Sequence, residues 1–265
     1  MLLARLANLK NRADPVIVPP MRSDGRAADQ LRPVKVTRRF TRAAAGSVLW
    51  EQGGTVVWCT ASVTPEVPPW FKETRPGGWI TAEYVMLPAS TPQRKAWPKT
   101  GHTDSRGTEI QRLIGRCLRG VIDLSKIGPH TIAIDCQVLQ ADGGTRTAAV
   151  CGAYVALADA LARLPAEIPA AAGYDPRGAL VDQLAAVSVG VVDGEVRLDL
   201  DYKDDSAAQV DMNVAYTAGG RFVEVQGSAE KLGGYDRREM DRMLDLAVKG
   251  CEQLMTIQRQ ALAVP

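Results

Sequence analysis

The sequence has only two histidines, His102 and His130, and this scarcity argues against several classes of enzyme. Neither histidine lies in the setting of a nucleophile elbow and no HExxH motif is present, so a Ser-His-Asp hydrolase and a zinc protease are both disfavoured. The lysine of the nucleotide-binding motif GxxxxGK(S/T) is missing, as is the GxGxxG of dinucleotide-binding folds. A catalytic site in this chain therefore depends on other side chains.

The chain also lacks a run of the roughly 20 apolar residues that a membrane span needs. Its five cysteines are far apart and include no CxxC pair. An odd number of cysteines in mostly apolar surroundings predicts reduced, buried thiols in a cytoplasmic protein. The lack of a long apolar run predicts that the protein has no membrane partner. In residues 1–20, basic residues interrupt the apolar ones, which predicts a poorly packed tail or an upstream start before a domain that begins at Met21.

No strong imbalance of charge is present, because the 265 residues carry a net charge of only +2. Between Arg94 and Arg119, however, seven Lys or Arg residues stand against two acidic ones. The loop that opens this stretch contains Arg94, Lys95, Trp97 and Lys99. Basic and aromatic residues together suit single-stranded nucleic acid, through phosphate neutralisation and base stacking. An ordinary surface loop explains the composition equally well.

The order of the expected elements predicts an α+β fold, with strands, a helix, a strand, a helix, strands and a final helix. Apolar runs around three turns predict β-hairpins, at Gly53-Gly54, Asp193-Gly194 and Gly219-Gly220. Helical spacing of apolar residues predicts three helices, around 110–121, over about 145–164 and over about 236–262. A connection rich in Pro, Ala and Gly, at about 165–178, marks a hinge between two halves.

The stretch Ala141–Ala148, ADGGTRTA, connects an expected strand to an expected helix. The first N–H groups of a helix lack internal partners and lie at the positive end of its dipole, so they can hold an anion. Gly143 and Gly144 would let an anion approach the backbone, while Thr145 and Arg146 add donors suited to phosphate oxygens. The stretch therefore predicts a site for a lone phosphate or phosphodiester, although a plain turn and helix cap has the same pattern.

Five carboxylates crowd into thirteen residues, namely Asp199, Asp201, Asp204, Asp205 and Asp211. Spacing of two predicts that Asp199 and Asp201 share one face of a strand, and a turn can bring Asp205 close to Asp211. Gathered carboxylates can hold Mg²⁺, and one with a raised pKa can donate a proton. A solvated acidic turn is the alternative.

Seven stretches follow one another from about Met21 to the C-terminus: MRSDGRAADQLRPVKVTRRF, GSVLWEQGGTVVWCTASV, WITAEYVMLP, TEIQRLIGRCLRGVIDL, TIAIDCQVLQADGGTRTAAVCGAYVALADAL, LAAVSVGVVDGEVRLDLDYKDDSAAQVDMNV and FVEVQGSAE. Together they resemble ribonuclease PH, a family of bacterial phosphate-dependent 3′→5′ exoribonucleases. The resemblance implies that residues 21–265 form one catalytic domain of two similar β-sheet and helix halves. It also implies a homohexameric ring built as a trimer of dimers.

The resemblance implies removal of 3′-terminal nucleotides from transfer-RNA precursors and other RNA 3′ ends, ribosomal RNA included. Inorganic phosphate would be the attacking co-substrate and nucleoside diphosphates the products, in a reaction that also runs backwards as nucleotidyl transfer. The implied phosphate-binding residues are Arg106, Gly143, Gly144, Thr145 and Arg146. The implied catalytic and metal-binding pair, with Mg²⁺ as cofactor, is Asp205 and Asp211, and the implied RNA-binding residues are Arg94, Lys95 and Lys99.

The chain departs from the family pattern at a few positions. Ala89 and Trp97 stand where arginines are expected in the loop that gathers RNA, TDSR replaces the usual SGR before the helix, and the connection over 174–183 is longer than usual. These differences concern RNA preference more than phosphate chemistry. The alternatives are a subunit of an exosome-like ring and a ring protein that binds RNA without cutting it.

Overall fold

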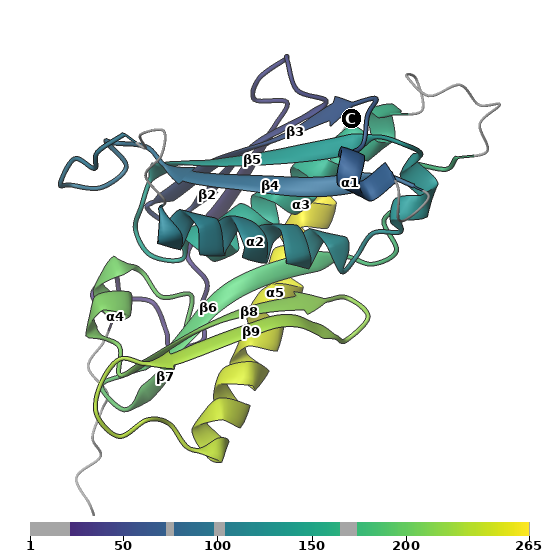
Figure 1. Cartoon of the computed structure of the whole chain (residues 1–265). Coiled ribbons are helices and arrows are strands. Elements are labelled where there is room, and N and C mark those ends of the chain that lie inside the picture. The colour runs from purple at the N-terminus through teal and green to yellow at the C-terminus, as the bar shows by residue number, and fades with distance from the viewer. Residues whose placement is uncertain (1–21, 73–76, 98–103, 165–173, 265) are drawn as a thin grey trace, which may run out of the picture.

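A computed structural model describes residues 22–72, 77–97, 104–164 and 174–264 of the chain. Two β-sheets lie one above the other with a long helix, α3, between them (Figure 1). The tail predicted over residues 1–20 lies outside the described residues. Within the described part, none of the helices has the length and apolar character needed to cross a bilayer.

The first sheet has five strands in the order β1-β2-β3-β5-β4. They are β1 (Val34–Arg38), β2 (Gly46–Gln52), β3 (Thr55–Thr64), β4 (Trp79–Met86) and β5 (Thr131–Gln140). β4 runs parallel to β5, and the other pairs are antiparallel. The predicted hairpin at Gly53-Gly54 is confirmed as the connection between β2 and β3. The helices of this half are α1 (Pro69–Lys72), α2 (Ser105–Arg119) and the short 3-10 helix η2 (Leu124–Ile127).

The second sheet has four strands in the order β7-β6-β8-β9, all antiparallel. They are β6 (Leu184–Val192), β7 (Glu195–Leu198), β8 (Val210–Thr217) and β9 (Phe222–Ala229). Both predicted hairpins of this half are confirmed, as β6–β7 and β8–β9. The long C-terminal helix α5 (Arg237–Ala263) covers one face of this sheet, and the short helix α4 (Tyr202–Ala207) lies at its edge (Figure 1).

Helix α3 (Thr145–Arg163) is buried on nearly every side because it packs on both sheets. Its sequence is rich in alanine, which lets the strands approach closely. At Gly46 of β2, an added Cβ atom would lie only 1.9 Å from the carbonyl oxygen of Ala156. Spacings of three and four predict core positions at Ala148, Cys151, Val155 and Ala158. The first three are buried, whereas Ala158 is half-buried, and burial extends well beyond this stripe.

The acidic segment folds differently from the prediction that Asp199 and Asp201 share one face of a strand. That prediction is wrong, because β7 ends at Leu198 and Asp199 has a φ of 52°. Asp201 caps the N-terminus of α4, where its side chain accepts a hydrogen bond from the Asp204 amide. The propensity of aspartate for left-handed and helix-cap conformations explains the change, which strand spacing alone does not reveal.

Candidate active site

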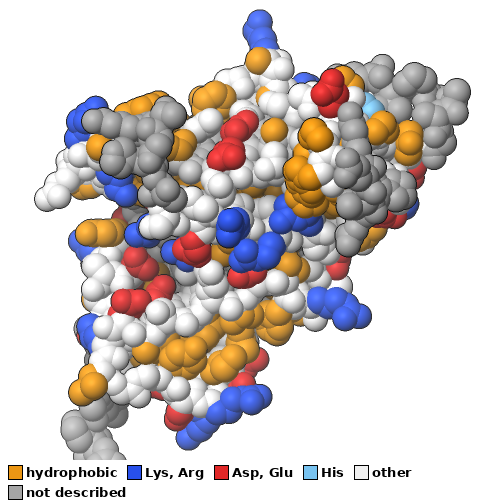
Figure 2. Space-filling model, viewed as in Figure 1, with side chains coloured by type: hydrophobic (Ala, Val, Ile, Leu, Met, Phe, Trp, Pro, Cys, Tyr) orange, Lys and Arg blue, Asp and Glu red, His pale blue; other side chains and the backbone are white. Residues whose placement is uncertain are grey.

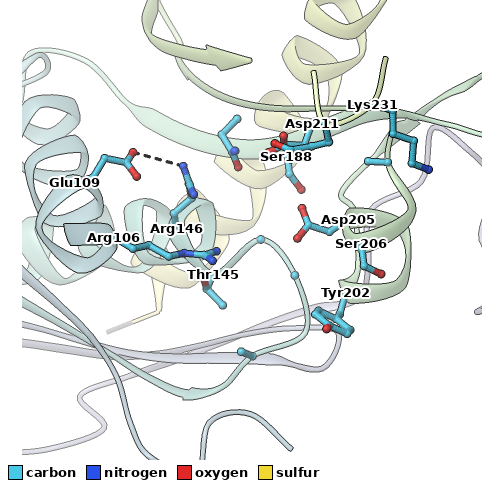
Figure 3. Close-up of a pocket in the computed structure, with 16 residues that line it drawn as sticks. Arg106, Glu109, Thr145, Arg146, Ser188, Tyr202, Asp205, Ser206, Asp211 and Lys231 are labelled. Carbon is cyan, nitrogen blue, oxygen red and sulfur yellow. Dashed lines mark ion pairs between the residues drawn. The ribbon is translucent and has the colours of Figure 1, made fainter. Parts of the chain in front are cut away.

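The residues predicted to bind phosphate and the predicted acids converge on one cleft of about 680 Å³ (Figure 3). They come from the first turn of α2, the loop and first turn of α3, helix α4 and strand β8. The predicted residues in its lining are Arg106, Gly143, Gly144, Thr145, Arg146, Asp205 and Asp211. Positions more than a hundred residues apart in sequence therefore meet at a single place between the two halves.

The loop before α3 has the geometry of an anion site. Gly143 and Gly144 both have positive φ, 73° and 64°, which glycine adopts without strain. Gly144 is the N-cap of α3 and has no side chain to bond the first amides of the helix. These amides are therefore available to an anion at the positive end of the helix dipole.

Two neighbouring side chains hold this loop in place. Thr55 donates a hydrogen bond to the Gly143 carbonyl at 2.6 Å and accepts one from the Asp142 amide at 3.0 Å. The hydroxyl of Tyr84 donates to Thr145 Oγ1 at 2.8 Å. Burial raises the pKa of Tyr84 to about 12, so this hydroxyl keeps its proton. The loop is thus fixed before any ligand arrives.

Two arginines flank the loop from different helices. Arg106 is the second residue of α2, and it is exposed. Arg146 lies in the first turn of α3, where its Nη1 donates to Gln226 Oε1 at 3.0 Å and lies 3.5 Å from Glu109 Oε1 (Figure 3). Both guanidinium groups face the cleft, opposite Asp205.

The two acids lie across the cleft from the arginines, and both have raised pKa values. Burial raises the pKa of Asp205, while Arg106 and Arg146 oppose that shift. Burial also raises the pKa of Asp211, and the nearby carboxylates of Asp205 and Glu230 add to the shift. Asp211 Oδ1 is buried and has no hydrogen-bond partner among the described residues. This side of the cleft can therefore hold a proton or a cation.

The lining of the cleft also includes residues that were not identified from the sequence. They are Glu109, Ser188, Tyr202, Ser206, Asn213, Glu230 and Lys231, together with Ala141 and Ala208. Of these, only Asn213 could have been predicted from the sequence, because it lies two residues after Asp211 on β8 and therefore shares the same face of the strand. Ser188 faces the same region because β6 pairs with β8 in a register that sets Ser188 opposite Asn213.

Some predicted residues do not join the cleft. Asp199 and Asp204 are buried in ion pairs with arginines, which assigns them a structural role. Arg94 and Lys95 are exposed and lie outside the lining of the cleft. The loop after β4, which carries them, lies at the end of the molecule where α2 begins (Figure 1). Lys99 lies outside the described residues.

Comparison with known families defines the class of protein. The model for domain 1 of the 3′ exoribonuclease family matches residues 30–162, and the model for domain 2 matches residues 182–250. The boundary between the two matches falls where the first sheet and α3 give way to the second sheet. The chain therefore belongs to the 3′ exoribonuclease family.

Within this family the chain is similar to ribonuclease PH, which agrees with the resemblance found in the sequence. It is 56% identical to ribonuclease PH of Nocardia farcinica, over 92% of this chain and 93% of the relative. It is 57% identical to ribonuclease PH of Rhodococcus erythropolis, over 92% of each chain.

Solved structures share the fold at much lower identity. A chain of the Archaeoglobus fulgidus exosome with RNA bound to the active site superposes with a TM-score of 0.71 at 23% identity, covering 89% of this chain and 91% of that one. Rice Rrp46 gives a TM-score of 0.71 at 20% identity, covering 91% of this chain and 100% of that one. The two-sheet architecture with a buried central helix is thus common to all three.

Proposed function

We propose that this protein is a phosphate-dependent 3′→5′ exoribonuclease that releases 3′-terminal nucleotides as nucleoside diphosphates. The observation that carries this proposal is the convergence of Arg106, the loop at Gly143-Gly144, Arg146 and the two acids on one cleft. The identity to ribonuclease PH relatives over almost the full length of both chains supports it. A complete set of phosphate-binding and acidic residues argues against a ring protein that has lost its activity.

The cleft suits an attack of inorganic phosphate on the last phosphodiester of an RNA. An oxygen of the phosphate bonds to the phosphorus of the terminal nucleotide, and the bond from that phosphorus to the 3′ oxygen of the preceding nucleotide breaks. Two anions must be held together for this step, and Arg106, Arg146 and the amides of the first turn of α3 offset their repulsion. Because a phosphodiester is exchanged for a diphosphate linkage, the same site catalyses nucleotidyl transfer in reverse.

The departing 3′ oxygen needs a proton, and the acids across the cleft fit that task. The raised pKa values of Asp205 and Asp211 favour a carboxyl group that keeps its proton closer to neutral pH. In the direction of synthesis the same carboxylate would remove the proton from the 3′ hydroxyl. The arginines on one side of the cleft would thus bind phosphate, while the acids on the opposite side would transfer the proton.

The same two acids fit a magnesium ion. Asp211 Oδ1 is buried without a partner among the described residues, and Mg²⁺ prefers carboxylate oxygens with several retained waters. Within the described ranges no group of three or more His, Cys, Asp or Glu could hold a metal ion, so retained waters would have to complete the coordination beside these two carboxylates. When bound there, Mg²⁺ would supply positive charge beside the transferring phosphoryl group.

We further propose that the substrates are transfer-RNA precursors and other RNA 3′ ends, and that Arg94, Lys95 and Lys99 gather them in the cytoplasm. The exposure of Arg94 and Lys95, on the loop that follows β4 at the end of the molecule where α2 begins, supports this. Replacing Arg94 and Lys95 together by alanine should weaken RNA binding and reduce its dependence on salt, by about 0.7 in log–log slope for each RNA phosphate that the variant no longer neutralises. The KM for phosphate should stay the same, whereas unchanged RNA affinity would exclude both residues.

Assembly into a homohexamer is also a proposal. β9 is an edge strand, and its side chains Phe222 and Val225 are exposed. Figure 2 shows hydrophobic side chains in a band over this sheet, in the lower half of the molecule. Exposed hydrophobic surface along an unpaired strand suits contact with another copy. Light scattering on the purified protein tests the number of copies.

The activity is tested by incubating the protein with Mg²⁺ and a short 3′-extended RNA, with and without phosphate. We expect nucleoside diphosphates only when phosphate is present, and equal cleavage without phosphate would identify a hydrolase instead. Arg106→Ala should lower phosphorolysis by at least about tenfold because it removes charge that faces the attacking anion. Arg112→Ala is the matched control, since Arg112 lies on the same helix but does not line the cleft.

A further inference from the structure

One buried arginine connects the phosphate loop to the segment that leads to Asp205. We infer that Arg32 is a positioning residue, which sets the loop at Asp142–Gly144 in its place relative to the acids of the second half. This inference rests on the proposed function and adds a residue that touches neither substrate. Arg32 belongs to the segment before β1, and only 4% of it is exposed.

One side of Arg32 holds Asp199, which is 1% exposed. The backbone amide of Arg32 and its Nε donate to Asp199 Oδ2 at 2.7 and 3.1 Å, and its Nη2 donates to Oδ1 at 2.7 Å. Asp199 has a positive φ of 52°, a conformation that costs free energy even for aspartate and that its buried contacts stabilise. The clamp by Arg32 contributes to that constraint, together with Arg22 and Arg26, which donate to the Asp199 carbonyl at 2.9 and 3.1 Å. Asp199 begins the segment that leads into α4 and to Asp205.

The other side of the same guanidinium holds the phosphate loop. Nη1 donates to the carbonyl of Asp142, and Nη2 donates to the carbonyl of Gly143 at 3.4 Å. The loop also rests on the guanidinium at Gly144, where an added Cβ atom would lie 3.0 Å from Nη2. A single planar group therefore bonds both the loop that would bind phosphate and the chain that leads to the acid.

Lysine cannot reproduce this arrangement. Its ammonium group is a compact charge, whereas the guanidinium fork presents donors in several fixed directions at once. Arg32→Lys would retain a positive charge beside Asp199 but would give up the simultaneous bonds to the loop carbonyls. The expected consequence is a loop that is displaced or less fixed relative to Asp205, while the surface that meets RNA is unchanged.

The matched control is Arg38, which forms a comparable ion pair far from the cleft. Its Nε donates to Asp159 Oδ1 and Oδ2 at 3.2 and 3.0 Å, and its Nη1 bonds the Ala261 carbonyl at the end of α5 at 2.9 Å. This pair joins β1 to α3 and α5, and neither partner lines the cleft. Arg38→Lys should therefore lose stability without changing the affinity for phosphate.

The test compares the wild type, Arg32→Lys and Arg38→Lys by three measurements. These are the KM for phosphate, the KM for RNA, and the Kd for inorganic phosphate without RNA by isothermal titration calorimetry. We expect Arg32→Lys to raise both phosphate constants at least about tenfold, because small misplacements of a binding group have effects of this size or larger. The KM for RNA should stay within about twofold, and Arg38→Lys should leave all three constants within about twofold.

Either of two results for the variants would overturn the inference. One is a phosphate affinity of Arg32→Lys within about twofold of the wild type, and the other is an equal loss in Arg38→Lys. If Arg32→Lys does not fold, Asp199→Asn decides by the same titration, with an expected rise in the phosphate Kd of about threefold or more. A wild type that binds phosphate but releases no nucleoside diphosphates refutes the proposed function and leaves this comparison intact. A wild type that binds no phosphate overturns the inference as well.

Discussion

Replacing Gly143 by alanine gives the most direct test of the site, because this residue touches the backbone of the acidic segment. An added Cβ atom would lie 2.5 Å from the Leu200 carbonyl oxygen, 2.6 Å from Asp201 C and 2.8 Å from Tyr202 N. All three are backbone atoms, so no side chain can rotate away. Gly143→Ala must therefore move the phosphate loop away from the segment that leads to Asp205.

The size of the effect follows from these distances. The closest approach, 2.5 Å, is about 0.9 Å shorter than the 3.4 Å at which ordinary contact begins. A misplacement of about 1 Å between reacting groups can lower the rate about a hundredfold, equivalent to about 2.7 kcal/mol of transition-state stabilisation. The φ of 73° adds a folding cost of about 1–2 kcal/mol for alanine, since L side chains clash in this conformation.

Gly194 provides the matched control, since it has a φ of 77° in the turn between β6 and β7 and no atom within 4 Å of an added Cβ. Gly194→Ala should carry the backbone strain without the displacement. We expect kcat/KM for phosphorolysis to fall about a hundredfold in Gly143→Ala and less than about threefold in Gly194→Ala, with unfolding in urea reporting the stability of each. Equal kcat/KM values in the two variants would refute the steric argument.

Three other predictions follow from burial in the structure. Asp211→Asn should abolish activity yet stabilise the fold by about 0.5–2 kcal/mol at pH 8. Because the folded-state pKa of Asp211 is raised, its charge destabilises the fold above that pKa, so the gain should vanish in urea unfolding as the pH falls toward the ordinary aspartate value. Ellman's reagent should react with none of the five cysteines in the folded protein and with all five in urea, since all are buried and burial raises the pKa of Cys117 and Cys151 to about 12. Leu157→Ala should cost about 2–5 kcal/mol in urea unfolding, because Leu157 is fully buried on α3, and a cost below about 1 kcal/mol would contradict the packing between the sheets.

Much of the fold could be predicted because its signals are local. Gly-Gly and Asp-Gly turns between apolar runs predict the hairpins, and the spacing of apolar residues predicts α2 and α5. The structure confirms these elements, although α2 begins earlier than the spacing indicated, at Ser105. The phosphate loop could also be predicted, because its residues are consecutive in the sequence, namely Gly143, Gly144, Thr145 and Arg146. The short helices α1 and α4 were missed because so few residues carry no periodic signal.

The rest of the site depends on contacts that no local pattern records. Asp199 and Asp205 look alike in the sequence, but Asp199 meets Arg32 in the core while Asp205 faces the cleft. Glu230 and Lys231 reach the cleft only because β9 folds back along β8. Which acid is structural and which is available for chemistry was therefore decided by tertiary packing.

The position of α3 between the two sheets determines how the anion site can open. The loop that would hold phosphate leads directly into a helix whose side chains belong to the cores of both halves. A local fluctuation cannot carry the first turn of α3 away without disturbing both cores, so the hydrogen-bonded amides of α3 beyond its first turn should exchange with solvent only in large-scale openings. The site would then meet phosphate with its donors already in place, and little conformational entropy would be lost on binding.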